Sequence, residues 1–293
     1  MKKLIYILVA MFALYGCRNN STIPNPVWNG TDTIATDSLE LDTVIAGVFY
    51  DDYPQTDIML PSSTEYDSIV FSDTTKELLH HVNVVKYIGG SDKARKTINK
   101  EIICRVDKDT VTKRVDVMSS IRGYHAHFLA EAKRGEYLYS AYTHRELIGV
   151  AYENEKFVTL GELGYESYGG AHGTPWKRYF TVDKVTGRLL GWNDIIRKEQ
   201  RGKLAYIVCE AILTQYDKGR DVGLYISRES LKDGISDEYL PDDAPALTDK
   251  GLLFTYAANE IGAYCAGLPE CLIPAIKVKD CLTDYAKSLL GVK

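Results

Sequence analysis

The stretch that decides the fold spans residues 156–183 and reads KFVTLGELGYESYGGAHGTPWKRYFTVD. Its outer parts, 156–163 and 176–183, are strand-like, since they are rich in Val, Thr, Tyr and Phe. The segment 169–173 between them reads GGAHG. Glycine permits positive φ angles and close backbone approach, so the chain can reverse its direction sharply there. The stretch therefore predicts two neighbouring strands joined by a glycine loop.

The rest of the chain contains further strand-like and helix-like segments. Ser91 has the chemistry of a helix N-cap, and Ala94, Ile98 and Ile102 follow it at helical spacing. Other helices are expected over 112–133, from Trp192 to Tyr216, and over 280–290. Further strands are expected at 66–71, 82–88, 137–144, 147–153, 252–256 and 271–278. Because these elements are interleaved without regular βαβ alternation, the sequence predicts an α+β fold: two abutting subdomains with antiparallel sheets and packed helices.

The N-terminus has the features of an export signal. Lys2-Lys3 precede an apolar run, Leu4–Leu14, and then Cys17. The run is shorter than the roughly 20 residues that span a bilayer, which indicates a lipoprotein signal peptide over 1–16 and lipid attachment at Cys17. Residues 17–45 are polar and are expected to form a flexible tether. We therefore expect a protein of the bacterial cell envelope that is attached to a membrane by its N-terminal lipid.

Charge and aromatic content narrow the choice of partner. The formal net charge is -5, which argues against nucleic acid as a partner. The acidic stretch 229–243 is interpreted as a solvated surface or a short helix and loop. If a cationic protein binds, the alternative is that this stretch steers it by charge. The 21 tyrosines far outnumber the 7 phenylalanines and 3 tryptophans. Tyrosine suits half-buried strand faces and recognition surfaces alike, so both interpretations stay open.

Several motifs accompany the glycine loop. The set comprises Tyr165–Gly173, Tyr179–Asp183, Thr186-Gly187-Arg188, Leu253–Tyr256, Ile261–Tyr264, Ala266-Gly267 and Ile273-Pro274. Together they resemble a domain of unknown function that occurs in the extracellular part of the lysozyme-sensing anti-sigma factor of Gram-positive bacteria. The same domain is the non-catalytic N-terminal part of certain peptidoglycan deacetylases. The resemblance implies a deacetylase-like N-terminal subdomain over 46–165 and an anti-sigma-like C-terminal subdomain over 166–293.

The resemblance also implies a function. It points to a non-catalytic binding domain for a lysozyme-like protein or for cell-wall glycan (peptidoglycan). The sequence lacks the internal membrane helix of the anti-sigma factor and the catalytic motifs of the deacetylase, so neither regulated cleavage nor deacetylation carries over. Two other hypotheses stay open: an enzyme that modifies envelope polymers through an unrecognised site, and a structural envelope lipoprotein.

Side chains around the glycine loop are the candidate ligand-binding residues. If the loop forms the rim of a groove, Tyr165, Tyr168, His172 and Trp176 would present flat faces to a sugar or a protein. Gly169-Gly170 would then let the ligand approach the backbone closely. The alternative is purely structural, because a tight reversal between two strands makes the same demand for glycine.

No motif for catalysis or for binding a metal or cofactor stands out. HExxH and GxSxG are both absent from the sequence, so we expect no catalytic residue, no metal and no cofactor. His125 and His127 would share a face only on a strand, whereas the sequence around them is helical. His80 and His81 are adjacent and would face opposite sides of a strand.

Cysteine usage leaves one candidate disulfide. With Cys17 assigned to lipid, the remaining five cysteines cannot all pair within one chain. Cys265 and Cys271 flank a short loop that could bring them together in an oxidising compartment. Cys104 and Cys209 lie in helical patterns and are interpreted as small buried residues.

Overall fold

The computed structural model describes residues 66–75, 78–106, 116–134, 142–168, 172–216, 223–232 and 234–293. All of them belong to one compact unit, Asp52–Lys293. Cys17 and Gly169-Gly170 lie outside the described residues. No helix within the described ranges is long and apolar enough to cross a membrane.

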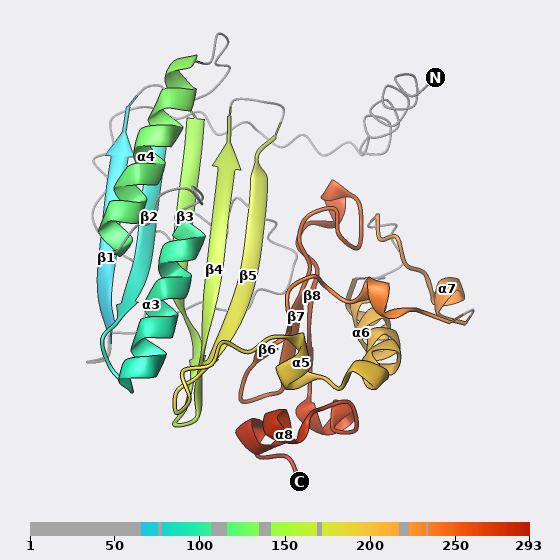
Figure 1. Ribbon diagram of the computed structural model, residues 1–293. Helices are drawn as coiled ribbons and strands as arrows, with labels where there is room; N and C mark the ends of the chain where they lie inside the picture. Colours follow the sequence, from blue (N-terminus) through green and yellow to red (C-terminus); the bar gives the residue numbers. More distant parts are fainter. Residues whose placement is uncertain are drawn as a thin grey trace. The chain divides into compact units, whose positions relative to one another are not determined.

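A five-stranded sheet forms the first half of this unit, with the strand order β1-β2-β3-β4-β5 (Figure 1). β1 pairs with β2, β3 with β4 and β4 with β5, all in antiparallel fashion. The strands are β1 (Tyr66–Thr74), β2 (Leu78–Tyr87), β3 (Tyr142–Glu153), β4 (Phe157–Ser167) and β5 (Thr174–Asp183). Residues 156–183 thus supply β4, β5 and the connection between them, as the sequence predicts.

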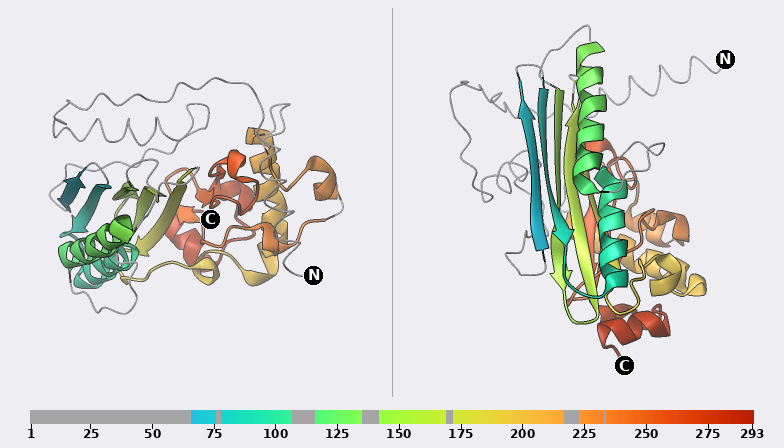
Figure 2. Two further views of the ribbon diagram at one scale, coloured as in Figure 1. Left: turned by 90° about the horizontal axis from the view of Figure 1, so that it is seen from above. Right: turned by 60° about the vertical axis from the view of Figure 1, so that its left-hand side comes forward.

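The pairing of β2 with β3 is parallel, which corrects the expectation of purely antiparallel sheets. Parallel neighbours need a long crossover, and here it contains α3 (Asp92–Val106) and α4 (Val117–Arg134). Both helices lie along one face of the sheet (Figure 2). The predicted N-cap is confirmed, because the Ser91 hydroxyl accepts the N–H of Ala94 at 3.2 Å.

α3 packs on the sheet through a single apolar stripe. Ala94, Ile98, Ile102 and Val106 recur every four residues and are fully buried. They meet Val82, Val84, Ile148, Leu160 and Val182 of the sheet in one core cluster. The spacing predicted from the sequence is therefore the spacing that forms this core.

β3 is one long strand where the sequence suggested two, at 137–144 and 147–153. Its register with β4 is unbroken from Thr143 to Val150, and an irregularity follows between Val150 and Tyr152. Of the two residues between the expected strands, Arg145 is partly buried and Glu146 is 0% exposed. Glu146 is therefore a buried polar residue on the face of the sheet that the helices cover, and it does not indicate a turn.

The second half contains a three-stranded antiparallel sheet, β6-β7-β8, and several helices. The strands are β6 (Ala246–Leu247), β7 (Leu252–Thr255) and β8 (Glu270–Ile273). The helices are α5 (Trp192–Ile195), α6 (Arg201–Tyr216), α7 (Arg228–Lys232) and α8 (Asp284–Leu290), with 3-10 turns η1 (Lys198–Gln200), η2 (Asp237–Tyr239), η3 (Tyr264–Ala266) and η4 (Ala275–Val278). The α+β prediction with two sheet-containing parts is confirmed.

Two expected elements in this half are shorter than predicted. The helix expected from Trp192 to Tyr216 is divided into α5, η1 and α6, because Ile196 leaves the helical conformation with φ -119° and ψ 131°. The strand expected over 271–278 ends at Ile273, before Pro274, which lacks the N–H that strand pairing requires.

The subdomain boundary expected between residues 165 and 166 falls inside β4, and the first sheet continues through β5 to Asp183.

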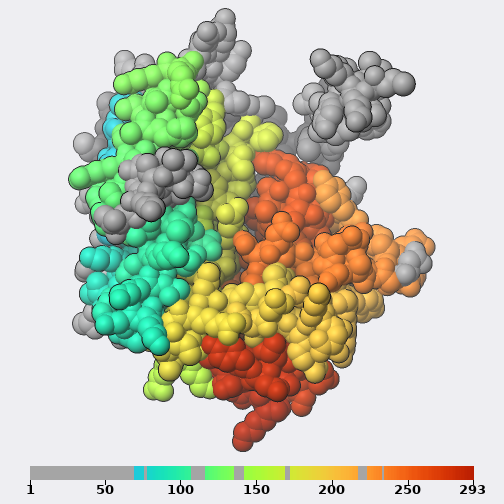
Figure 3. All heavy atoms as spheres, viewed as in Figure 1, coloured from blue at the N-terminus to red at the C-terminus, as the bar shows by residue number. Residues whose placement is uncertain are grey.

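The two sheets contact each other through side-chain hydroxyls. The main-chain N–H of Leu247 donates to Oγ1 of Thr181 at 3.0 Å, and Oγ1 of Thr159 donates to the carbonyl of Leu247 at 2.6 Å. Figure 3 shows the orange and red C-terminal residues packed beside the yellow-green strands.

Candidate functional site

Trp176 and Tyr165 lie on opposite faces of the first sheet. Trp176 pairs across the strands with Gly164, whereas Tyr165 pairs with Pro175, and side chains alternate between the two faces along a strand. The indole ring covers Gly164 and stacks on His144 with ring centroids 5.8 Å apart. Trp176 therefore belongs to the face that carries α3 and α4, and it cannot share a groove with Tyr165.

Tyr168 lies near α4 and is held in place by polar contacts. Its hydroxyl donates to Oε1 of Glu166 at 2.8 Å, and the hydroxyl of Tyr124 from α4 reaches the same oxygen. Its ring makes edge contacts with Phe128 and Tyr142. Burial, reinforced by Glu166, raises the pKa of Tyr168 to about 12. With 46% of its surface exposed, Tyr168 stays accessible while being anchored.

His172 points to the second half of the unit. Its ring stacks on Tyr264 with centroids 4.2 Å apart, and the Tyr264 hydroxyl donates to the carbonyl of Gly173 at 2.7 Å. A Cβ at Gly173 would lie 2.3 Å from the ring of Tyr165, so the close approach requires glycine. Tyr165, Tyr168, His172 and Trp176 thus take three directions, and the described parts of the loop favour the structural interpretation.

We expect Gly164→Ala to lower the free energy of unfolding by about 1–3 kcal/mol, because overpacking displaces a neighbouring ring. The added Cβ would lie 2.1 Å from Cζ2 of Trp176. Urea denaturation followed by tryptophan fluorescence measures the change. Gly202→Ala in α6 is the matched control, since a Cβ there meets nothing within 4 Å. A Gly164→Ala variant as stable as the control would contradict this packing.

A chain of histidines and carboxylates connects α4 to the sheet. Nδ1 of His125 lies 2.8 Å from Nδ1 of His80, and its Nε2 lies 3.0 Å from Oδ2 of Asp73. His144 and Glu146 continue the row on β3, both 0% exposed.

This row does not form a metal centre with the HxH pair. His127 is exposed, so it and His125 point apart on the helix, as the helical interpretation predicted. Within the described ranges no three His, Cys, Asp or Glu side chains are grouped so that they could hold a metal ion. The histidines instead pack as aromatic rings, for example His80 against His144 at 4.8 Å.

The candidate disulfide is not formed in this structure. Cys271 belongs to β8 and is a free thiol that is 2% exposed, whereas Cys265 is exposed. Cys104 is exposed as well, so its interpretation as a buried residue was wrong. Burial raises the pKa of Cys209 to about 12, and it raises that of Cys271 as well. Because the thiolate is the reactive form, the raised pKa values disfavour reaction at these two buried thiols.

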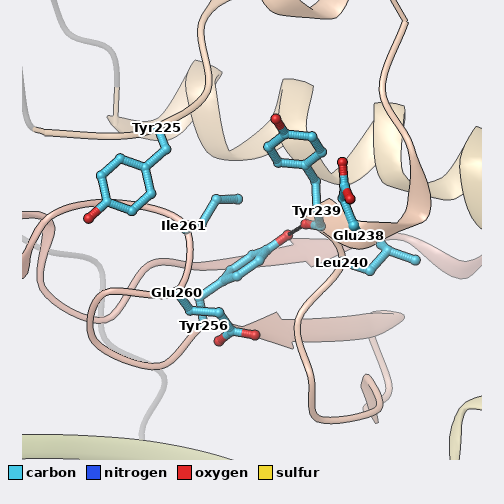
Figure 4. A pocket seen from close by; sticks show the side chains of 7 residues that line it. All are labelled: Tyr225, Glu238, Tyr239, Leu240, Tyr256, Glu260 and Ile261. Atoms are coloured by element: carbon cyan, nitrogen blue, oxygen red, sulfur yellow. Dashed lines mark hydrogen bonds between the residues drawn. The ribbon is translucent and has the colours of Figure 1, made fainter. Parts of the chain in front are cut away.

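A pocket of about 310 Å³ lies in the second half of the unit. Figure 4 shows Tyr225 and Tyr239 on opposite sides of Ile261, with Tyr256 below them. Its lining consists of Tyr225, Glu238, Tyr239, Leu240, Tyr256, Glu260 and Ile261. The lining thus combines tyrosine rings, two apolar side chains and two carboxylates, with no basic residue among the parts of the chain that the structure describes.

Hydrogen bonds connect the three segments that line the pocket, which are Tyr225, residues 238–240 and residues 256–261. The N–H of Tyr225 donates to the carbonyl of Ile261 at 2.9 Å. The Tyr256 hydroxyl donates to the carbonyl of Tyr239 at 2.8 Å (Figure 4). The Glu260 carboxylate accepts the N–H groups of Asp242 and Ala257 at 2.6 and 2.5 Å. The walls are therefore preformed.

The pocket has a negative character. Burial raises the pKa of Glu260, and the neighbouring charges of Asp242 and Asp243 act in the same direction. Glu238 is exposed at the rim. Among the described residues, neither Glu238 nor Glu260 pairs with a lysine or arginine, and the nearby Arg178 is directed to Asp243 at 3.8 Å. A cation in the pocket would relieve this concentration of negative charge.

Sequence reasoning missed most of the pocket. It noted the acidic stretch 229–243, which contributes Glu238 and the η2 turn. Tyr256 and Ile261 belong to motifs quoted for the resemblance, but neither was assigned to a binding site, and no motif contains Tyr225. Their convergence depends on long-range pairing, such as the bridge between Leu224 and Gly262.

Comparison with solved structures identifies the fold. A DUF3298 family member from Bacteroides fragilis matches with a TM-score of 0.60 and 18% identity, covering 78% of this chain and 97% of that chain. The chain has the DUF3298 fold. A DUF3298 protein from Pseudomonas aeruginosa also matches, with a TM-score of 0.53, 18% identity, and coverage of 79% and 98%.

The DUF3298 fold is that of a domain of unknown function, in agreement with the kind of domain expected from the sequence. No protein-family model matches the chain. No curated protein matches it either. Identity of 18% establishes the fold alone, so function must be argued from the pocket.

Proposed function

We propose that this protein is a lipoprotein anchored at Cys17 in the bacterial cell envelope, and that its folded part is a non-catalytic binding module. Its ligand would be a lysozyme-like protein or cell-wall glycan. The observation that carries the proposal is the pocket between Tyr225, Tyr239 and Tyr256. Tyrosine rings can recognise a partner by contact, and carboxylates can recognise one by complementary charge.

Electrostatics favours the protein ligand over the glycan. The described residues that line the pocket include two carboxylates and no basic side chain, and the whole chain carries a net charge of -5. A cationic protein of the lysozyme type is attracted by such a surface, and opposite charges accelerate the encounter. A neutral glycan gains nothing from this charge, although it could still stack on the tyrosines.

Calorimetry tests the proposal. Residues 17–293 carrying Cys17→Ser, and therefore free of lipid, are titrated with lysozyme and separately with soluble peptidoglycan fragments. We expect saturable heat with lysozyme that weakens as salt is added, because salt screens charge attraction. Lysozyme whose lysines have been succinylated is the matched control and should bind far more weakly.

The competing results are distinct. If neither lysozyme nor the peptidoglycan fragments produced heat, the proposal that one of them is the ligand would be wrong. Heat with peptidoglycan alone would assign the glycan as the ligand. Release of new fragments from peptidoglycan would instead show that the protein is an envelope polymer-modifying enzyme.

A further inference from the structure

We propose that the pocket lined by Tyr225, Tyr239 and Glu260 receives an arginine side chain of a protein partner. The inference rests on the proposed function, since it names the contact by which a cationic protein would be held. Its basis is the combination, at one place, of aromatic faces, small volume and two carboxylates that form no ion pair with a lysine or arginine of the described ranges.

The size of the pocket suits a single side chain. Pockets for small molecules range from about 300 to 1,000 Å³, and this one, at about 310 Å³, is at the lower limit. It would enclose a guanidinium group with its three methylene groups. It offers little room for a sugar chain, which would have to lie across the surface instead.

The aromatic walls suit a flat cation. Tyr225 is 61% exposed and Tyr239 is partly buried, so one ring is free to cover a ligand while the other is fixed. Guanidinium groups stack on the faces of tyrosine rings, where the negative charge of the ring face attracts them. Ile261 and Leu240 supply apolar surface for the methylene groups between the charge and the partner's backbone.

The two carboxylates of the pocket, Glu238 and Glu260, favour a positively charged ligand. Glu238 at the rim can accept two parallel N–H bonds from a guanidinium group. Glu260 has both oxygens engaged by main-chain N–H groups, so it contributes charge rather than a new hydrogen bond. Because the pKa of Glu260 is already raised, a neighbouring cation would favour its ionised form.

A pair of matched small probes tests the pocket without a protein partner. Residues 17–293 carrying Cys17→Ser, labelled in their tyrosine rings, are titrated with N-acetyl-arginine amide and with N-acetyl-citrulline amide. Citrulline has almost the same shape and no charge. We expect the arginine probe to shift the NMR signals of Tyr225 and Tyr239, which are assigned with single Tyr→Phe variants, and the citrulline probe to leave them unmoved.

Two exposed positions supply variants that should not affect folding. We expect Glu238→Gln and Tyr225→Leu each to weaken arginine binding about five-fold or more. Asp249→Asn, at an exposed acid outside the pocket lining, is the matched control and should leave binding unchanged. Equal shifts with both probes, shifts at other tyrosines, or displacement of the arginine probe by N-acetylglucosamine oligomers would overturn the inference.

The pocket and the proposed function can fail separately. If the arginine probe binds but lysozyme does not, the pocket stands and the assumed partner is wrong. If lysozyme binds equally well to wild type, Glu238→Gln and Tyr225→Leu, the proposed function stands and the pocket inference is wrong.

Discussion

Arg105→Met is expected to lower the free energy of unfolding by about 3–5 kcal/mol, since it leaves the Glu162 carboxylate buried without its partner. The ion pair joins α3 to β4. Nη1 of Arg105 lies 2.8 Å from Oε2 of Glu162, and the two side chains are 19% and 3% exposed. The guanidinium group also lies 4.2 Å from the centre of the Phe180 ring. Methionine preserves most of the packing volume and removes only the charge and its hydrogen bonds.

Urea denaturation monitored by circular dichroism measures the loss. The double variant Arg105→Met/Glu162→Leu is the informative control, because replacing both partners of a buried ion pair by apolar residues is often neutral. We expect it to regain most of the stability that the single variant loses. A single variant within about 1 kcal/mol of wild type would contradict the buried position of the Glu162 carboxylate.

Asp183→Ala is expected to cost about 3 kcal/mol, because several hydrogen bonds to one ionised carboxylate are lost together. Asp183 ends β5 and is 3% exposed. It accepts the N–H groups of Val185 and Thr186, both at 2.7 Å, and the hydroxyl of Tyr285 in α8 at 2.5 Å. The carboxylate therefore stabilises the turn after β5 and attaches the C-terminal helix to it.

The same carboxylate makes stability depend on pH. Burial opposes its ionisation most strongly, but the hydrogen bonds from Tyr285, Thr186 and Val185 outweigh burial and hold its pKa below the usual value. The unfolded chain binds this proton more readily than the folded one, with a pKa of about 3.9. The ionised Asp183 carboxylate therefore contributes its full stabilisation well above pH 4, and this stabilisation is lost as the pH falls through the folded-state pKa.

The Asp183→Asn variant isolates this effect. It keeps the shape of the side chain and removes the charge, so we expect its stability to vary less with pH between about 5 and 2 than that of wild type. Thermal unfolding at a series of pH values measures the difference. Asp249→Asn, at an exposed turn position, should follow wild type throughout. Parallel curves for wild type and Asp183→Asn would contradict the assigned hydrogen bonds.

Local patterns in the sequence were sufficient for individual elements. The cap at Ser91 and the four-residue spacing of Ile98 and Ile102 are properties of one helix, and both are found in α3. The glycine-rich stretch likewise gave a pair of strands joined by a loop. Each of these signals depends only on neighbouring residues, so no knowledge of the remaining chain was required.

Features that depend on distant segments could not be predicted. The continuation of β3 through Glu146 depends on His144 beside it, and His144 is covered by the ring of Phe128 from α4. The tyrosine pocket requires the segments of Tyr225, Tyr239 and Tyr256 to converge, and no single segment carries a binding motif. The predicted aromatic rim is divided because alternate residues of a strand face opposite sides. Tyr165 and Trp176 lie on adjacent strands but on opposite faces.

The parallel pairing of β2 with β3 has a consequence for how the chain acquires its structure. Leu78 of β2 pairs with Tyr142 of β3, and α3 and α4 lie between these strands in the sequence. β2 and β3 can therefore pair only when the segment that contains both helices crosses the sheet. Closing a long loop costs conformational entropy, and this cost precedes the favourable contacts between the strands. The strands of β1-β2 and of β3-β4-β5, in contrast, are joined by short connections. The β1-β2 hairpin can therefore join the rest of the sheet only after β3 has been synthesised.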